Sequence, residues 1–176
     1  RLLSYLKSPN LGAEVATLPE LFIAQKAGYA PSKIVFDSPA KTYEELKYAL
    51  EAGVHINADS FDELDRIAIL KKSISSGSHI GIRVNPHVGI GKISITSVSG
   101  SYTKFGESLT ESKEQLSNYF ERYRWLRGIH LHIGSQGCTL EQLIEGVRRV
   151  YKFVAEINQN LGRNQIIYFD IGGGFP

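Results

Sequence analysis

The sequence predicts an α/β protein built on a parallel sheet. Short β-rich runs alternate with helical segments, and several of these runs are apolar at consecutive positions rather than at every second one. Consecutive apolar positions are typical of strands that are covered on both faces. Polar or glycine residues follow almost every run. From this pattern alone, the sheet is either doubly wound or closed as a (β/α)8 barrel.

The β-rich runs and one long glycine- and serine-rich stretch divide the chain. The expected strands are Ala13–Thr17, Lys33–Asp37, Val54–Ala58, His79–Asn85, Gly128–Gly134 and Ile166–Ile171. These six strands are two fewer than a (β/α)8 barrel needs. The stretch Pro86–Leu109 is expected to be a loop with a short hairpin, and loops of that length are usually functional or mobile.

Helices are expected between the strands. Three begin with the capping-box pattern, at Thr42-x-x-Glu45, Ser60-x-x-Glu63 and Thr139-x-x-Gln142. Glycines at positions 28, 53 and 162 are placed to end helices. The later helices are expected over Thr110–Tyr123 and Thr139–Leu161.

Composition excludes several classes of protein. The chain has 176 residues, of which 42% are hydrophobic and 22% charged, which argues against disordered, collagen-like and coiled-coil proteins. A formal net charge of +2 gives no reason to expect nucleic acid or a membrane surface as a partner. The single cysteine, Cys138, cannot form an internal disulfide and fits a reducing, cytoplasmic location.

The sequence contains no methionine. It begins at Arg1 within a predicted helix (residues 1–7) and stops just after a glycine run. We therefore expect a piece of a longer protein.

Polar side chains gather where the predicted strands end. The relevant segments are Thr17, Asp37-Ser38, Asn57–Ser60, Arg83 to Asn85, His132–Gln136 and Asp170–Gly174. Each can be explained singly as a helix cap or a turn. Together they favour one shared site, because ligands of parallel α/β proteins bind at the carboxyl ends of the strands.

The glycine run Gly172–Gly174 follows the last predicted strand. Its backbone can approach a ligand closely, and its N–H groups can hold an anion. It lacks the lysine and hydroxyl of a Walker A loop and the spacing of a dinucleotide fingerprint. A tight turn is the alternative interpretation.

His130 and His132 are two residues apart on a predicted strand, so they should share a face. They could belong to a metal site, but no third ligand has suitable spacing. One ring could instead stack on a flat cofactor. An interior histidine held by hydrogen bonds is the best interpretation of His130.

Two charged residues lie inside predicted strands, and a third lies in the long loop. Arg83 and Glu14 should not be buried alone, so they either form a buried pair or each serves a polar site. Lys104 could contact a substrate, a cofactor phosphate or another subunit. A solvated lysine is the default interpretation.

These segments together resemble the fold-type III pyridoxal-phosphate (PLP) decarboxylases, the family of diaminopimelate, ornithine and arginine decarboxylases. The similar motifs, in order, are Glu14-Val-Ala-Thr-Leu-Pro-Glu20-Leu, Lys33-Ile-Val-Phe with Lys41-Thr, Asn57-Ala-Asp-Ser-x-x-Glu63-Leu, Arg83-Val-Asn-Pro86, Thr103-Lys-Phe-Gly106, His130-Leu-His-Ile-Gly-Ser-Gln136 and Asp170-Ile-Gly-Gly-Gly-Phe-Pro176. The histidine motif is most similar to that of the diaminopimelate decarboxylases, which convert meso-diaminopimelate to lysine and CO2.

The resemblance implies a (β/α)8 TIM barrel of the alanine racemase-like type, incomplete here, with about six of eight βα units. It implies PLP at the strand ends, an amino-acid substrate, and a homodimer with its active site between subunits. By analogy, His132 stacks on the cofactor ring, while Ser135 and the Gly172–Gly174 backbone hold the phosphate. Residues of the polar ring near the Schiff base would be Glu14, Glu20 and Arg83. Lys104 would lie near the subunit interface.

Residues 1–176 would then be one partial PLP-binding barrel domain. The first strand with the Schiff-base lysine, the last strand and the C-terminal β domain have no counterpart in the sequence. No catalytic residue is therefore assigned, and the span alone should neither close a barrel nor catalyse. Three alternatives stay open: a decarboxylase of another basic amino acid or polyamine precursor, a non-catalytic regulatory relative, and an unrelated phosphate-binding barrel.

Overall fold

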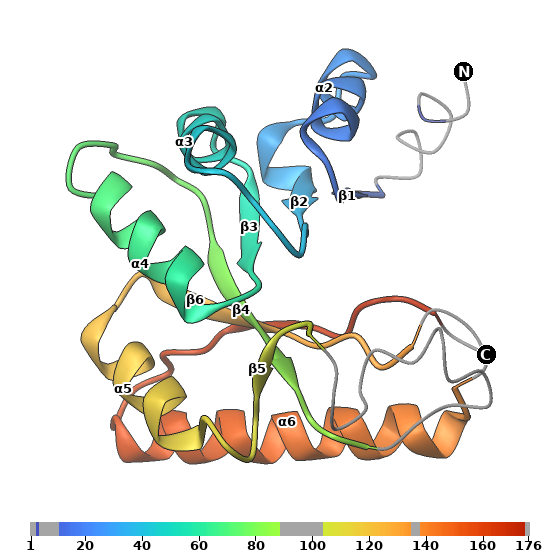
Figure 1. Ribbon diagram of the computed structural model, residues 1–176, viewed down its shortest axis with the longest axis vertical. Coiled ribbons are helices and arrows are strands. Elements are labelled where there is room, and N and C mark those ends of the chain that lie inside the picture. Colours follow the sequence, from blue (N-terminus) through green and yellow to red (C-terminus); the bar gives the residue numbers. More distant parts are fainter. Residues whose placement is uncertain (1–2, 4–10, 89–103, 135–137, 175–176) are drawn as a thin grey trace. The chain divides into compact units, whose positions relative to one another are not determined.

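The computed structural model describes residue 3 and residues 11–88, 104–134 and 138–174. The chain forms two compact units, unit 1 over Arg1–Ile80 and unit 2 over Gly81–Pro176. Figure 1 shows that each unit repeats the strand–helix alternation expected from the sequence. The helix expected over residues 1–7 lies outside the described residues, apart from Leu3.

Unit 1 contains three short parallel strands in the order β1-β2-β3. They are β1 (Ala13–Val15), β2 (Ile34–Phe36) and β3 (His55–Ala58). In the register of the sheet, Val15 lies beside Phe36, and Phe36 lies beside Ile56. The helices of this unit are α2 (Leu18–Lys26), α3 (Tyr43–Ala52) and α4 (Phe61–Leu70), with a 3-10 turn over Pro31–Lys33 before β2.

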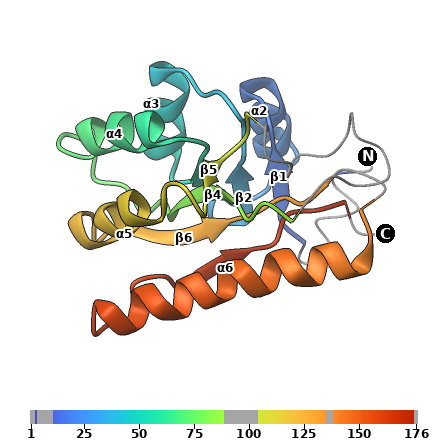
Figure 2. The same ribbon diagram turned by 60° about the horizontal axis from the view of Figure 1, so that its bottom comes forward.

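The helices of unit 1 lie along one side of its strands (Figure 2). The core between them is apolar and fully shielded from solvent at Ile34, Phe36, Leu46, Leu50, Ile56, Leu64 and Ile67. Burying each such side chain contributes roughly 1.5–3 kcal/mol. This packing fixes where the strands end, and therefore where the polar residues after them lie.

Unit 2 contains the strand order β4-β6-β7, with a short β5 added to β4. Its elements are β4 (Ile80–Asn85, beginning at the last residue of unit 1), β5 (Glu107–Ser108), α5 (Lys113–Arg122), β6 (Leu126–His130), α6 (Leu140–Asn160) and β7 (Tyr168–Asp170). All six residues of β4 are buried, which confirms for this strand the expectation of cover on both faces.

The longest helix, α6, runs beside the strands of unit 2 (Figures 1 and 2). Its buried residues recur at helical spacing, at positions 143, 146, 150, 153 and 157. Phe153 packs near Phe120 of α5, with the two ring centres 6.4 Å apart. This apolar seam joins the two helices of unit 2.

Several predicted boundaries are wrong in detail. The fifth predicted strand, Gly128–Gly134, is observed as β6 over Leu126–His130, so His132 follows the strand instead of lying in it. The described end of the long loop contributes β5, which runs parallel to β4 and is not an arm of a hairpin with it.

The three predicted capping positions are confirmed as helix starts, with one difference, whereas the helix expected from Thr110 begins at Lys113. Thr42 and Thr139 each form a complete capping box, with Glu45 and Gln142 respectively. Ser60 accepts the backbone N–H of Glu63, but the Glu63 carboxylate bonds elsewhere. Within the described part of the chain, no helix is both long and apolar enough to cross a membrane.

Candidate functional site

His132 and the glycine turn after β7 are in direct contact. The backbone N–H of Gly173 donates a hydrogen bond to Nδ1 of His132 over 3.3 Å. Gly172 has a φ of +68°, and a Cβ at this position would lie 2.6 Å from the carbonyl oxygen of Leu131 and 2.8 Å from Nδ1 of His132. The close approach therefore requires glycine at position 172.

The glycine turn is braced on both sides. Asp170 accepts the backbone N–H of Gly172 through Oδ1 over 2.9 Å, while its own carbonyl accepts the N–H of Leu131. The Cys138 thiol lies 3.5 Å from the carbonyl oxygen of Gly174. These contacts hold the turn beside the segment that follows β6. Two motifs about 40 residues apart, each singled out from the sequence, thus meet in one place.

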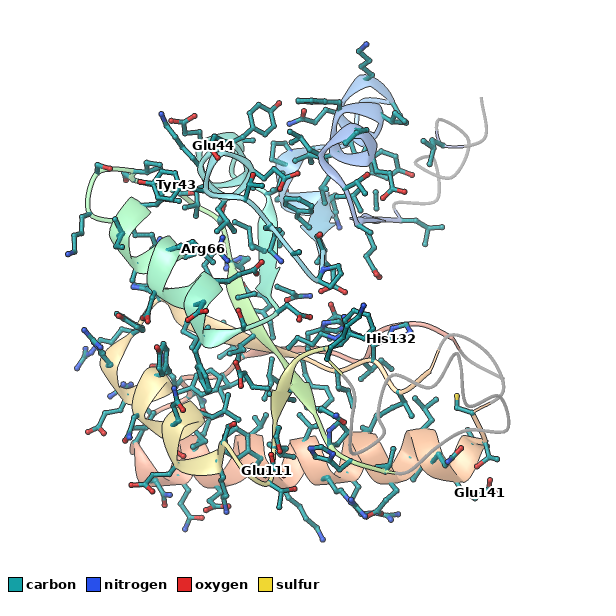
Figure 3. All side chains as sticks on the ribbon, in the orientation of Figure 1. Tyr43, Glu44, Arg66, Glu111, His132 and Glu141 are labelled. Carbon is teal, nitrogen blue, oxygen red and sulfur yellow. The ribbon has the colours of Figure 1, made fainter. Side chains whose placement is uncertain are left out.

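The two histidines have different environments. His130, the last residue of β6, is 1% exposed, as expected for an interior histidine. His132 is half-buried and lies on the segment after the strand (Figure 3). Their ring centres are 6.5 Å apart. Among the residues that the structure describes, no group of three or more His, Cys, Asp or Glu side chains could hold a metal ion.

Arg83 lies in a second cluster in unit 2, at the end of β4. Its guanidinium carbon lies 5.1 Å from the centre of the Phe105 ring. The ammonium of Lys104 lies 5.3 Å from the same ring centre. Gly106 has a φ of +71°, and a Cβ there would lie 2.9 Å from Cγ of Arg83. The pairing of β4 with β5 fixes this contact, because Val84 lies beside Glu107.

This second cluster also joins two motifs of the sequence, Arg83–Pro86 and the segment ending at Gly106. Arg83 is buried, with 8% of its surface exposed, whereas Lys104 is exposed. A guanidinium over an aromatic face gains electrostatic stabilisation, which offsets part of the cost of burial. The Phe105 ring therefore helps to stabilise the buried charge of Arg83, one of the predicted site residues.

Glu14 is exposed on β1. The prediction that it forms a buried pair with Arg83 is therefore wrong. The cause is strand alternation: the neighbouring Val15 is buried on the helix-covered face, and Glu14 points to the opposite one. The alternative in which each residue serves a polar site stays a prediction.

Glu20 lies in the first turn of α2, the helix that Thr17 caps. Its Oε2 accepts the backbone N–H of Ala16 over 2.7 Å, and its own N–H donates to Oγ1 of Thr17. Thr17-x-x-Glu20 thus has the same Thr-x-x-Glu spacing as the predicted capping boxes, a signal that the sequence analysis did not use. The proline at position 19 is tolerated because it lies in the first turn of α2.

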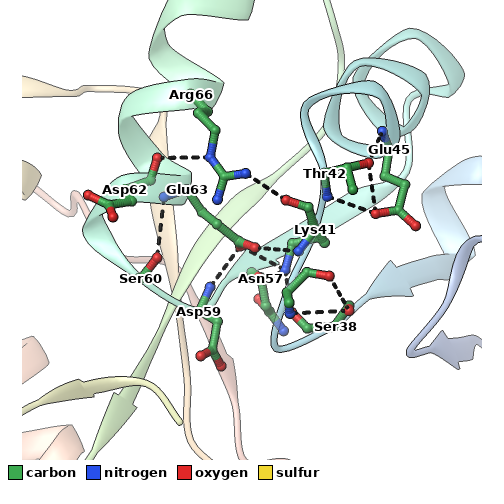
Figure 4. A network of polar contacts seen from close by, with 11 residues as sticks. Ser38, Lys41, Thr42, Glu45, Asn57, Asp59, Ser60, Asp62, Glu63 and Arg66 are labelled. Carbon is green, nitrogen blue, oxygen red and sulfur yellow. Dashed lines mark hydrogen bonds and ion pairs between the residues drawn. The ribbon is translucent and has the colours of Figure 1, made fainter. Parts of the chain in front are cut away.

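A buried network that the sequence analysis missed lies after β2 and β3 of unit 1 (Figure 4). The Lys41 ammonium is 2.9 Å from Oε2 of Glu63 and donates hydrogen bonds to the carbonyl oxygens of Ser38 and Asn57. The Lys41 side chain is 0% exposed, and that of Glu63 is 2% exposed.

Backbone groups complete the network around Glu63. Its carboxylate accepts the N–H groups of Lys41 and Asp59, over 2.8 Å and 3.0 Å. Arg66 donates to the carbonyl oxygen of Lys41 over 2.8 Å. The network connects the loops after two neighbouring strands. Because the ammonium of Lys41 is fully engaged, this buried lysine is not suited to form a covalent bond with a cofactor.

The residues near His132 fit a flat cofactor that carries a phosphate. A half-buried imidazole whose Nδ1 accepts a backbone N–H can present a ring face. The adjacent turn has no side chains over Gly172–Gly174 to obstruct an anion, and Gly172 and Gly174 have positive φ angles. Ser135, the other predicted phosphate ligand, lies outside the described residues.

Comparison with known proteins shows the family of the chain. The family model "Pyridoxal-dependent decarboxylase, pyridoxal binding domain" matches residues 1–176. The chain is 30% identical to the diaminopimelate decarboxylase of Zymomonas mobilis, covering 98% of this chain and 41% of that protein. It is 33% identical to the diaminopimelate decarboxylase of Helicobacter pylori, covering 98% of this chain and 43% of that protein.

A solved structure supports the fold. The crystal structure of Helicobacter pylori diaminopimelate decarboxylase complexed with L-lysine is 32% identical and has a TM-score of 0.83, covering 98% of this chain and 44% of that chain. This confirms the predicted fold class, an incomplete (β/α)8 TIM barrel. The chain spans less than half the length of the curated relatives it matches.

Proposed function

Because the chain belongs to the pyridoxal-dependent decarboxylases, whose pyridoxal-binding domain it matches over residues 1–176, we propose that the complete gene product decarboxylates meso-diaminopimelate to lysine. The observation that carries the proposal is the joint placement of His132 and the glycine turn, in a chain about 30% identical to several diaminopimelate decarboxylases. The same ring and the same turn suit the two ends of PLP.

In this proposal, His132 stacks on the PLP ring, and the backbone of Gly172–Gly174 with Ser135 holds the phosphate. The turn leaves room for a phosphate because it has no side chains, although the N–H groups of Gly172 and Gly173 are donated to Asp170 and His132 in this structure. The chemistry that PLP supplies when bound is an electron sink for the charge left on the amino acid as CO2 departs. The protein must hold the ring flat and keep the substrate in one orientation.

Two charged residues would serve the polar side of the site. Arg83 carries a permanent positive charge and is fixed by Phe105 and Gly106, so it can orient an acidic group without moving. Glu14, which is exposed in the middle of β1, would join Arg83 in the polar ring near the Schiff base. Lys104 would lie close to the second subunit of a homodimer.

The remaining parts of the site are proposed to come from sequence outside these 176 residues. They are the strand with the PLP-binding lysine, the last barrel strand and a C-terminal β domain. This proposal is supported by the relatives, which are more than twice as long as the region they share with the chain. The family match is consistent with a cytoplasmic enzyme.

The test uses the complete gene product, purified with PLP. CO2 release and product formation would be measured with meso-diaminopimelate, L-ornithine and L-arginine. We expect turnover of meso-diaminopimelate, and loss of both PLP retention and turnover in His132→Ala. His55→Ala is the matched control, since His55 begins β3 at the amino end of the strand, where ligands of parallel sheets do not bind.

Each alternative has its own result in this experiment. Turnover of ornithine or arginine instead would support a different decarboxylase of the family. A protein that binds no PLP and releases no CO2, but associates with an active decarboxylase, would be a non-catalytic relative. Unchanged PLP retention and turnover in His132→Ala would contradict the stacking role.

A further inference from the structure

The hydrogen bond to His132 determines which ring nitrogen carries the proton. Nδ1 accepts the backbone N–H of Gly173 over 3.3 Å, and an accepting imidazole nitrogen has no hydrogen of its own. The neutral ring must then carry its proton on Nε2. Protonation of Nδ1 would replace this attraction with a contact between two donors, so the contact also favours the neutral ring.

The same contact fixes the orientation of the ring. A 180° flip of the imidazole about the Cβ–Cγ bond would exchange Nδ1 with a carbon and lose the hydrogen bond. The Gly173 N–H therefore favours one of the two orientations of the ring. Gly172, the preceding residue, places this N–H, because it lies against the backbone of Leu131 and His132.

Gly172 can occupy this position only without a side chain. A Cβ would lie 2.6 Å from the carbonyl oxygen of Leu131, which is backbone and cannot rotate away, and 3.2 Å from Cα of His132. The φ of +68° is a second obstacle to any other residue. Asp170 holds the turn in place by accepting the Gly172 N–H.

We propose that Gly172 is a positioning residue for His132: its missing side chain brings the Gly173 N–H to Nδ1 and so holds the neutral ring with its proton on Nε2. The consequence for catalysis rests on the proposed function. A neutral imidazole in one orientation presents an uncharged face to an electron-poor cofactor ring, whereas a protonated imidazole would repel it. The turn that is proposed to hold the phosphate would then also orient the stacking ring.

The test is nuclear magnetic resonance of the complete gene product, as purified, with 15N-labelled histidine. Long-range proton–nitrogen spectra distinguish a protonated from an unprotonated ring nitrogen, and His132→Asn identifies the signals. We expect an unprotonated Nδ1 and a protonated Nε2 at neutral pH. Gly172→Ala should lose this signature and give averaged nitrogen signals. It should also raise the dissociation constant of PLP by up to about tenfold, the factor for one lost hydrogen bond.

Gly173→Ala is the matched control. It keeps the backbone N–H, its φ is not positive, and the nearest atom to its Cβ would be Cε1 of His132 at 4.0 Å. The His132 signature should therefore persist in this variant. Loss of the signature in Gly173→Ala, or its retention in Gly172→Ala, would overturn the assignment to Gly172.

The wild-type spectrum keeps the inference falsifiable even if Gly172→Ala does not fold. A wild-type His132 protonated on Nδ1 contradicts the inference, whatever cofactor the protein binds. Conversely, the expected tautomer in a protein that binds no PLP supports the positioning role and contradicts the proposed function. The two failures are thus distinguishable.

Discussion

Removal of the Lys41 ammonium should destabilise the protein by about 3–5 kcal/mol, the usual cost of breaking a buried ion pair from one side. Lys41→Met keeps the length and the apolar stem of the side chain but leaves the Glu63 carboxylate, 2% exposed, without its cation. It also leaves the carbonyl oxygens of Ser38 and Asn57 without a donor. The free energy of unfolding would be measured by urea denaturation of the complete gene product, followed by circular dichroism.

The control is Lys47→Met on α3. Lys47 is 3.9 Å from Glu51, and both side chains are 53% exposed, so the same substitution should cost less than about 1 kcal/mol. The double variant Lys41→Met with Glu63→Gln removes both charges and keeps an acceptor for one backbone N–H. It should cost less than the sum of the two single variants. If Lys41→Met costs no more than Lys47→Met, the buried pair does not stabilise this unit as argued.

Three further predictions concern packing, capping and pH. Gly106→Ala should lower the free energy of unfolding by about 1–3 kcal/mol, because the new Cβ would lie 2.9 Å from Cγ of Arg83 at a positive φ. Gly77→Ala is the control: a Cβ there would meet no atom within 4 Å, so this variant should be nearly neutral in the same urea titration. Thr139→Ala should lower the free energy of unfolding by about 1 kcal/mol through loss of the α6 capping box, and Thr139→Ser should restore most of it. Hydrogen bonds from Arg149 and Arg148 lower the pKa of Glu145, so its stabilising effect is present above the unfolded-state pKa and lost as the pH falls through the folded-state value. The melting temperatures of wild type and Glu145→Gln should therefore differ at neutral pH and converge once the pH falls below the folded-state pKa of Glu145; a difference that grows in acid would contradict this sign.

The architecture could be predicted because each local signal agreed with the fold. Apolar runs at consecutive positions marked strands covered on both faces, and the observed β4 is buried at all six positions. The end of β6 could not be predicted in the same way. The apolar pattern continues through Leu131 and Ile133, which are buried, although the strand ends at His130. Burial continues past the strand because Leu131 lies against the glycine turn and Ile133 lies against Gly146 of α6. Periodicity cannot reveal such tertiary contacts.

The candidate site was partly predictable for the same reason. Residue type marked the glycine turn and His132 separately as candidates for the site. A run of glycines and a polar residue after a strand each have few purely structural explanations. Their hydrogen bond, and the contact of Gly106 with Arg83, join segments tens of residues apart and needed coordinates. Lys41 gave no signal of burial, because a lysine before a capping box is usually solvated.

The Ser/Thr-x-x-Glu/Gln pattern shows how far such local signals extend. At Thr42 and Thr139 the acidic or amide side chain returns to the capping residue, and at Thr17 the carboxylate of Glu20 bonds one residue earlier, to Ala16. At Ser60 the hydroxyl caps the helix as expected, but the carboxylate of Glu63 is buried and pairs with Lys41. An exposed carboxylate gains little by leaving the cap, whereas a buried one must find a cation or several N–H donors. The spacing therefore encodes where a helix begins, and burial decides which partner the acid takes. For this reason a buried acid in a capping position is a good place to look for a hidden cation.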